Sequence, residues 1–420
     1  MTMNLDKIRT VGKYGAAKVV PGLILFGAVP LWTRLFGSAE YGLYSIIWAA
    51  SLASSSLFTG WLRQAVLRHS GQDDLSISRL PRWVVPLAIF LAAVPACLIT
   101  WLQTPSEDTG QMALLAIVSF AFAATNAQYV VKQASTQRDM LATRYTWAEV
   151  TRASATVLIS ACLAVLTPLP GSTAILVAYI VGTLAATTIL SAGHTSESVE
   201  SSASSATLRI FWSFGWPMAI WLTASSLLLY IDRIIITAIL GSDAAGNYAA
   251  TVDLIVRGFA MVSFPLTMAS HPIMMRAWNE GHHEKAMAIN RTYVRYLLLI
   301  GLVALLCGSV VGNAAVVLVL GMTPTNIWVV PLLTLGAVLW QVALMTHKAL
   351  EVLNRTKTMA AIIVAITCVS TLGNIVLIPV LGILSPALLF ALGALTYLLL
   401  TYFLGQRALT RATLVTGKTR

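Results

Sequence analysis

Long apolar segments recur along the whole of this chain, and each is near the length of about 20 residues that crosses a lipid bilayer. Only 10% of the residues are charged and 57% are hydrophobic, which is too little charge to cover the surface of a soluble protein of this size. The sequence therefore predicts an all-α, polytopic membrane protein. We expect about twelve transmembrane helices, at residues 14–36, 40–62, 83–103, 111–133, 147–167, 171–191, 212–240, 246–275, 291–317, 326–347, 358–380 and 384–406.

The loops between these spans alternate in charge. All but four of the 27 Lys and Arg residues lie in the termini, in the even-numbered loops or at the helix ends beside them. The odd-numbered loops contain neither residue type; they are 37–39, 104–110, 168–170, 241–245, 318–325 and 381–383. Because Lys and Arg concentrate in cytoplasmic loops, both termini are predicted to be cytoplasmic. This topology accounts for the net charge of +11, and no nucleic-acid partner is expected.

A Ser-rich segment at the midpoint predicts two lobes. Residues 192–211 contain many Ser residues and resemble a flexible cytoplasmic linker. On this interpretation residues 1–191 form an N-terminal six-helix lobe, and residues 212–420 form a C-terminal six-helix lobe with a basic tail.

A short motif, G-S-x-x-x-G-x-Y, supports this division, because it follows both the first and the seventh span at an offset of 204 residues. Each copy begins a short outer loop and opens the next helix, where Gly permits a tight turn. Six spans repeated in the same orientation indicate parallel repeats, an arrangement common in secondary transporters. The residues that define the two copies are Gly37, Gly42 and Tyr44, and then Gly241, Gly246 and Tyr248.

Charged residues inside the spans are the candidates for function, since a charge at membrane depth costs at least about 2.5–3.5 kcal/mol unless it has a partner or a wet cavity. Asp253 and Arg257 are four residues apart and can pair along one helix. Asp232 and Arg233 are adjacent, so their side chains point about 100° apart. We expect Arg233 to face a cavity and Asp232 to face a neighbouring helix or the interface.

Three further positions complete the predicted cationic cavity. Lys18 either faces an anionic group or reaches the cytoplasmic interface. Arg63 ends a polar stripe along the second span, formed by Trp48, Ser51, Ser55, Thr59 and Arg63. Lys132 lies at the end of span four. The small polar residues of the stripe either bind sugars or serve helix packing.

Basic residues outnumber acidic residues on these inner faces, which favours an anionic cargo. The substrate-binding candidates are Lys18, Arg63, Arg233 and Arg257, and Asp232 and Asp253 are candidates for ion coupling or charge tuning. In spans one to six we expect no acid at mid-membrane depth, with Glu149 at the start of span five. An exporter of cations would need an acid at mid-membrane depth in these spans.

The chain resembles the bacterial polysaccharide (O-antigen-type) flippases of the multidrug, oligosaccharidyl-lipid and polysaccharide exporter superfamily. The resemblance rests on Arg34-Leu35-Phe36-Gly37 and Tyr41-Gly42-Leu43-Tyr44, and on Asp232-Arg233 followed by Gly241 and Gly246-Asn247-Tyr248. It implies two six-helix lobes around a central cavity with alternating access. The implied cargo is an oligosaccharide on undecaprenyl pyrophosphate, moved across the cytoplasmic (inner) membrane for O-antigen or lipopolysaccharide synthesis.

No motif of an ATPase, hydrolase or metalloenzyme is present, so we expect a secondary transporter and no enzyme, without cofactor or metal. A coupling ion, H⁺ or Na⁺, is left open. Expected partners are the lipid-linked oligosaccharide and membrane lipids, with a polysaccharide polymerase and other assembly proteins as further candidates. The alternatives are an ion-coupled small-molecule or drug exporter of the same fold, and an integral membrane glycosyltransferase or polymerase.

Overall fold

The computed structural model describes residues 5–68, 77–103, 109–192, 205–322, 326–353 and 355–417. These residues are almost entirely helical, and no strand occurs among them. Within them, eleven helical segments are long and apolar enough to cross a membrane. Helices suit a membrane because each satisfies its own backbone hydrogen bonds. The predicted all-α, multi-pass fold is therefore confirmed.

The first of the eleven segments contains two spans. Helix α1 (Leu5–Phe58) is interrupted at Gly37, whose φ of 81° lies in the left-handed region. The ring centroids of Trp32 and Tyr44 are 5.3 Å apart, whereas twelve residues of unbroken helix would separate them by about 18 Å. The chain thus turns back at Gly37, which brings the number of spans to twelve. We call residues 38–58 the second arm of α1, and α2 (Gly60–Arg68) continues it.

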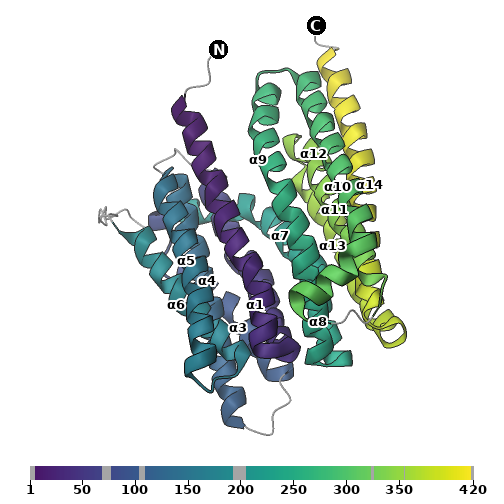
Figure 1. Ribbon diagram of the computed structural model, residues 1–420. Coiled ribbons are helices and arrows are strands. Elements are labelled where there is room, and N and C mark those ends of the chain that lie inside the picture. The colour runs from purple at the N-terminus through teal and green to yellow at the C-terminus, as the bar shows by residue number, and fades with distance from the viewer. Residues whose placement is uncertain are drawn as a thin grey trace. The chain divides into compact units, whose positions relative to one another are not determined.

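The chain divides into two compact units, Met1–Gly246 and Asn247–Arg420. In the first unit, α1 packs against α3, α5, α6 and α7, and α7 also packs against α2 (Figure 1). The remaining elements of this unit are the 3₁₀ turn Ile77–Arg79, α3 (Val84–Gln103), α4 (Thr109–Arg138), α5 (Ala142–Leu166), α6 (Gly171–Ser191), α7 (Ser205–Leu240) and the start of α8 (Ser242–Val252).

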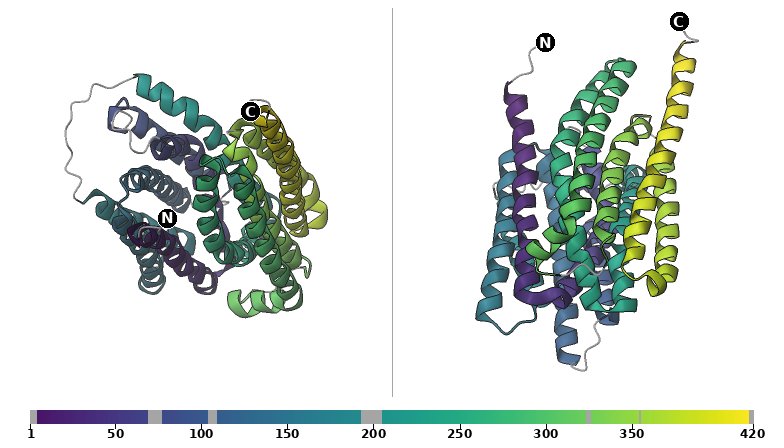
Figure 2. Two further views of the ribbon diagram at one scale, coloured as in Figure 1. Left: turned by 90° about the horizontal axis from the view of Figure 1, so that it is seen from above. Right: turned by 45° about the vertical axis from the view of Figure 1, so that its right-hand side comes forward.

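In the second unit, α11 packs against both α10 and α14, and α13 packs against α14 (Figure 2). Its elements after α8 are a π-helical turn (Asp253–Arg257), α9 (Gly258–Asn279), α10 (His283–Leu320), α11 (Val329–Thr346), α12 (Lys348–Val352), α13 (Thr356–Leu381) and α14 (Leu384–Gly417).

The predicted linker lies mostly outside the described residues, at 193–204. Its last part, 205–211, is the beginning of α7. Because α7 packs against α1 and α2, it belongs to the first compact unit. The lobe boundaries at 191 and 212 stay a prediction.

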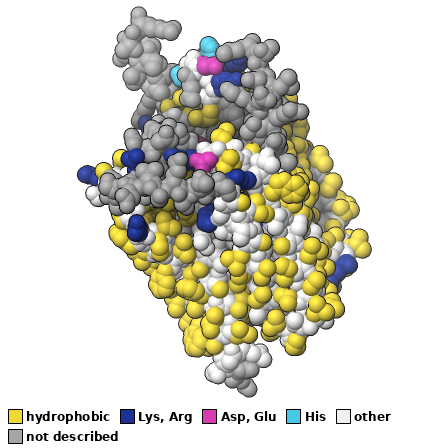
Figure 3. Space-filling view, turned by 90° about the vertical axis from the view of Figure 1, so that its left-hand side faces the viewer, with side chains coloured by type: hydrophobic (Ala, Val, Ile, Leu, Met, Phe, Trp, Pro, Cys, Tyr) yellow, Lys and Arg dark blue, Asp and Glu magenta, His cyan; other side chains and the backbone are white. Residues whose placement is uncertain are grey.

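Hydrophobic side chains cover much of the outer surface. Val165 on α5 is 81% exposed and Val310 on α10 is 83% exposed. On the face shown in Figure 3, hydrophobic side chains dominate the middle, and most of the visible Lys and Arg side chains lie toward the end at which the N-terminus is drawn in Figure 1. An exposed apolar surface of this extent is the surface that a lipid bilayer solvates.

Candidate functional site

The polar stripe predicted on the second span is buried in the first unit. Ser51 and Ser55 lie on the second arm of α1 and are almost inaccessible, and Arg63 on α2 is half-buried. Thr59 between them donates to the carbonyl oxygen of Ser55 at 2.7 Å. Ser51 Oγ, Ser55 Oγ and Arg63 Nε are all buried without a hydrogen-bond partner among the described residues. Buried polar atoms are rarely left unpaired in native proteins, so this stripe is suited to a polar ligand or water.

On α7, Asp232 and Arg233 are both buried. Asp232 Oδ1 accepts a hydrogen bond from the backbone N–H of Arg233 at 2.8 Å. The Arg233 guanidinium lies over the ring of Tyr230, 4.8 Å from its centroid. A cation–π contact of this kind helps to stabilise a buried cation. The structure therefore holds Arg233 inside the first unit, and its role in substrate binding stays a prediction.

In the second unit, Asp253 and Arg257 form an ion pair, with Asp253 Oδ1 3.0 Å from Arg257 Nε. The Asp253 side chain is 1% exposed and that of Arg257 is 27% exposed. Both belong to a π-helical turn between α8 and α9. π turns are rare and frequently occur at functional sites. Spacing predicted the pair, but nothing in the hydropathy of these residues distinguishes the π turn from an ordinary helix.

Lys18 lies in α1, but its side chain is outside the described part of the structure. Lys132 on α4 donates to Ser191 Oγ on α6 at 2.6 Å. This contact fastens two helices of the first unit together.

A polar cluster that the sequence did not predict lies around Glu149 and Arg152 on α5. Tyr129 Oη donates to Glu149 Oε1 at 2.6 Å, and the guanidinium of Arg152 donates to Asn126 Oδ1 at 2.7 Å. Arg152 also lies 4.7 Å from the centroid of the Tyr129 ring. Tyr44, a residue of the first repeat motif, approaches the same region through Tyr179, with their hydroxyl oxygens 3.3 Å apart.

Glu149 is half-buried in the first unit. Helix α5 begins at Ala142, five residues before the predicted span, so Glu149 lies about two turns inside the helix. The expectation that no acid of the first six spans lies at mid-membrane depth stays a prediction. The i, i+3 pair of charges, Glu149 and Arg152, is the sequence signal that could have identified the cluster.

The two repeat motifs have matching backbone conformations, since Gly37 and Gly241 both have positive φ, at 81° and 90°. They also touch within the first unit. A Cβ added at Gly42 would collide with the carbonyl oxygen of Ser242, and one added at Gly246 would collide with that of Ser38. Because Ser38 and Ser242 are equivalent in the repeat, the contact is reciprocal. Ser38 Oγ additionally donates to Asp243 Oδ1. Tyr248, the last residue of the second motif, is buried.

Comparison with known proteins gives one family and one fold. The sequence model of the family described as "Polysaccharide biosynthesis protein" matches residues 31–329. No match was found among curated proteins.

Among solved structures, an inward-facing multidrug resistance MATE family transporter of the MOP superfamily has a TM-score of 0.71 at 12% identity, over 94% of this chain and 98% of that one. A MATE structure in complex with MaL6 has a TM-score of 0.67 at 13% identity, over 96% of each chain. A MOP superfamily transporter from Pyrococcus furiosus, whose reverse polarity of binding pocket is said to suggest a different function, has a TM-score of 0.61 at 13% identity, over 96% and 95%. These similarities show the fold of this chain.

Proposed function

Because this chain belongs to the polysaccharide biosynthesis protein family and has a MOP-superfamily transporter fold, we propose that it is a flippase for a lipid-linked oligosaccharide. The cargo is an oligosaccharide on undecaprenyl pyrophosphate, carried from the inner to the outer leaflet of the cytoplasmic membrane. The product then serves the synthesis of a surface polysaccharide of the O-antigen or lipopolysaccharide type. In this proposal both termini of the chain are cytoplasmic, as the loop charges predict.

The unpaired polar stripe in the first unit is the observation that carries this proposal. Ser51 Oγ, Ser55 Oγ and Arg63 Nε are buried and have no partner among the described residues. An oligosaccharide diphosphate offers hydroxyl groups to the two serines and anionic oxygens to the arginine. Charged oxygens form the stronger hydrogen bonds with a guanidinium, so Arg63 would bind a phosphate and the serines would bind sugar.

The Asp253–Arg257 pair supplies a mechanism for coupling. When a phosphate of the cargo binds Arg257, it competes with Asp253 for the same cation. Asp253 is buried, and a buried carboxylate that loses its partner is costly, so it would take up H⁺ or Na⁺. Substrate binding and ion binding would then be linked through one ion pair.

A second candidate, an ion-coupled exporter of small molecules or drugs, is favoured by the similarity in fold to MATE transporters and by the half-buried Glu149. A third candidate is an integral membrane glycosyltransferase or polymerase. The Pyrococcus transporter described by its reverse pocket polarity is a precedent for this fold with a different cargo.

The test is a clean knockout complemented with variants. Loss of the protein should trap undecaprenyl-linked glycan on the inner leaflet and remove surface glycan. Arg63→Gln should fail to restore export, whereas Arg68→Gln, at the exposed end of the same helix, should restore it. Normal surface glycan in the knockout would refute the proposal. Efflux of cationic compounds by proteoliposomes would support the exporter, and a covalent product from purified protein and sugar-lipid would support the enzyme.

A further inference from the structure

An apolar groove follows α7 in the first unit. Near the start of α7, a cavity of about 580 Å³ opens between α7, α3 and the second arm of α1, and four tryptophans line it: Trp61, Trp83, Trp212 and Trp216. A second cavity of about 230 Å³ lies farther along the same helices. Leu57 and Phe58 line both cavities, so the two meet there to form one groove.

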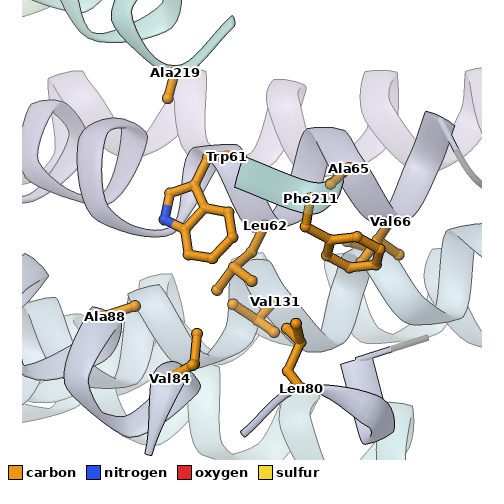
Figure 4. Close-up of a cluster of buried hydrophobic side chains, with 11 residues drawn as sticks. Trp61, Leu62, Ala65, Val66, Leu80, Val84, Ala88, Val131, Phe211 and Ala219 are labelled. Carbon is orange, nitrogen blue, oxygen red and sulfur yellow. The ribbon is translucent and has the colours of Figure 1, made fainter. Parts of the chain in front are cut away.

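The wider part of the groove has a rigid aromatic wall. Trp61 packs edge-on against Trp212 at 5.1 Å, and Trp212 stacks on Trp216 at 4.8 Å. Trp61 also belongs to a buried hydrophobic cluster, in which Leu62 lies between Trp61 and Phe211 of α7 (Figure 4). Trp83 is 60% exposed and Trp212 is 46% exposed, so their rings are available to a ligand.

Three hydroxyl groups that line the narrower part of the groove are hydrogen-bonded, unlike those of the stripe on the same arm of α1. In its narrower part, Thr223 donates to the carbonyl oxygen of Ala219 and Ser226 to that of Leu222, both at 2.8 Å. Ser54 donates to the carbonyl oxygen of Ala92 at 2.7 Å. Because these hydroxyl groups are already satisfied by backbone oxygens, the groove is suited to a hydrocarbon occupant.

One end of the groove carries a positive charge. Apart from the tryptophans, the polar residues of the wider cavity are Ser205 and Arg209, both in the first turns of α7. Arg209 is exposed. A ligand with an anionic group at one end and a long apolar chain would complement this distribution of charge.

The length of the groove distinguishes between two possible lipid ligands. Its lining on α7 extends from Ser205 to Ile234, which is about 44 Å of helix. An acyl chain of a phospholipid fills one leaflet, about half of a 30 Å hydrocarbon core. A polyisoprenyl chain is long enough to follow the whole groove.

We propose that this groove holds the polyisoprenyl chain of the lipid carrier, with the anionic end of the carrier toward Arg209; the inference rests on the proposed flippase function. At 100° per residue, the groove-lining Ala53 lies about 160° from both Ser51 and Ser55. Phe58, which lines both cavities, lies within about 60° of them, so the groove and the polar stripe share an edge of the second arm of α1. This arrangement lets the sugar and the chain of one carrier contact neighbouring faces of the same arm.

Photolabelling of the full-length protein in phosphatidylcholine vesicles tests the groove. The probe is a polyisoprenyl phosphate with a diazirine in its chain, and mass spectrometry locates the label. We expect labels along the whole groove, on α3 and α7 and on the residues of α1 and α2 that line it. Leu87→Gln should reduce labelling about fivefold, through the loss of apolar contact. The matched control is Leu98→Gln on the same helix, outside the groove and similarly exposed, at 54% against 44% for Leu87, and it should leave labelling unchanged.

Labels confined to helices that do not line the groove, or equal losses in the two variants, would overturn the proposal. So would a diazirine phosphatidylglycerol that labels the groove and is not displaced by polyisoprenyl phosphate. Labelling does not depend on transport. A knockout with normal surface glycan beside a labelled groove would refute the flippase function alone, and loss of surface glycan without groove labelling would refute the groove alone.

Discussion

At the scale of the residue, hydroxyl groups on one arm of α1 have two different environments. Ser54 bonds to the backbone of α3, whereas Ser51 and Ser55 are buried without a partner among the described residues. A hydrogen bond that is made contributes modestly to stability, and a buried group that makes none lowers it. Neighbouring serines therefore contribute to stability with opposite sign.

Ser51→Ala and Ser54→Ala should consequently differ in both stability and transport. We expect Ser54→Ala to lower the free energy of unfolding by about 0.5–1 kcal/mol, and to reduce export less than Ser51→Ala does because the wall of the groove stays apolar. Ser51→Ala should leave stability unchanged or raise it, and should reduce export because a substrate contact is lost. Thermal unfolding in detergent and a surface-glycan assay measure the two effects. A loss of stability in Ser51→Ala would show that its hydroxyl has a structural partner.

At the Asp253–Arg257 pair, too, effects on stability can be measured apart from effects on export. Arg257→Ala should lower stability, by less than the ~3–5 kcal/mol of a fully buried pair because Arg257 is partly exposed, and it should abolish export. The double variant Asp253→Asn/Arg257→Gln removes both charges and should recover most of the stability without export. Recovery of export in this neutral pair would contradict the role of Arg257 in binding an anionic cargo.

At the scale of the element, the crossing of α1 and α8 depends on glycine. Gly42 and Gly246 each lie against a backbone carbonyl of the other motif, so no side chain fits between the helices. Close approach of this kind lets helices associate in a membrane, where apolar burial contributes little. The crossing thus joins the two copies of the repeat motif by backbone contact.

Gly42→Ala should therefore destabilise the first unit by about 2 kcal/mol, since the added methyl group meets backbone and cannot be accommodated by a rotamer change. Gly27→Ala on the same helix is the matched control, because nothing lies within 4 Å of its added Cβ. It should change stability by no more than about 0.5 kcal/mol. Thermal unfolding midpoints of the two variants measure this difference. Equal midpoints would show that α1 and α8 can move apart at the crossing without loss of stability.

Hydropathy predicts the number of helices well and their ends less well. The apolar runs located all twelve spans because lipid demands helices of a minimum length. Helices α5 and α10 begin at Ala142 and His283, five and eight residues before the predicted spans, because backbone hydrogen bonding continues past the apolar segment. The pairing of Tyr129 with Glu149 depends on how helices pack together, which residue spacing along one helix does not contain.

At the scale of the whole molecule, the alternation of loop charge predicts which ends of the helices face the cytoplasm. Pro168 lies in an uncharged loop and is exposed, and Lys285 lies near the start of α10 and is also exposed. The four native cysteines lie within helices and can be replaced by alanine to provide a background for labelling.

In that background, Pro168→Cys should react with a membrane-impermeant maleimide in intact spheroplasts. Lys285→Cys should react only after the membrane is permeabilised. Modification is read as a mass shift on a gel. Labelling with the opposite sidedness would invert the topology and would move Arg209 to the outer leaflet, away from the side on which the cargo is made.

The crossing of α1 and α8 constrains how the sequence can evolve. Any missense change at codon 42 or codon 246 adds at least a Cβ, and the atom it meets is a main-chain oxygen of the other motif. That oxygen is present whichever amino acid occupies position 38 or 242, so no second missense mutation there can compensate. Neither glycine can therefore be replaced through successive single substitutions. As lineages diverge, we expect both glycines to persist together while the helices that they join continue to drift in sequence.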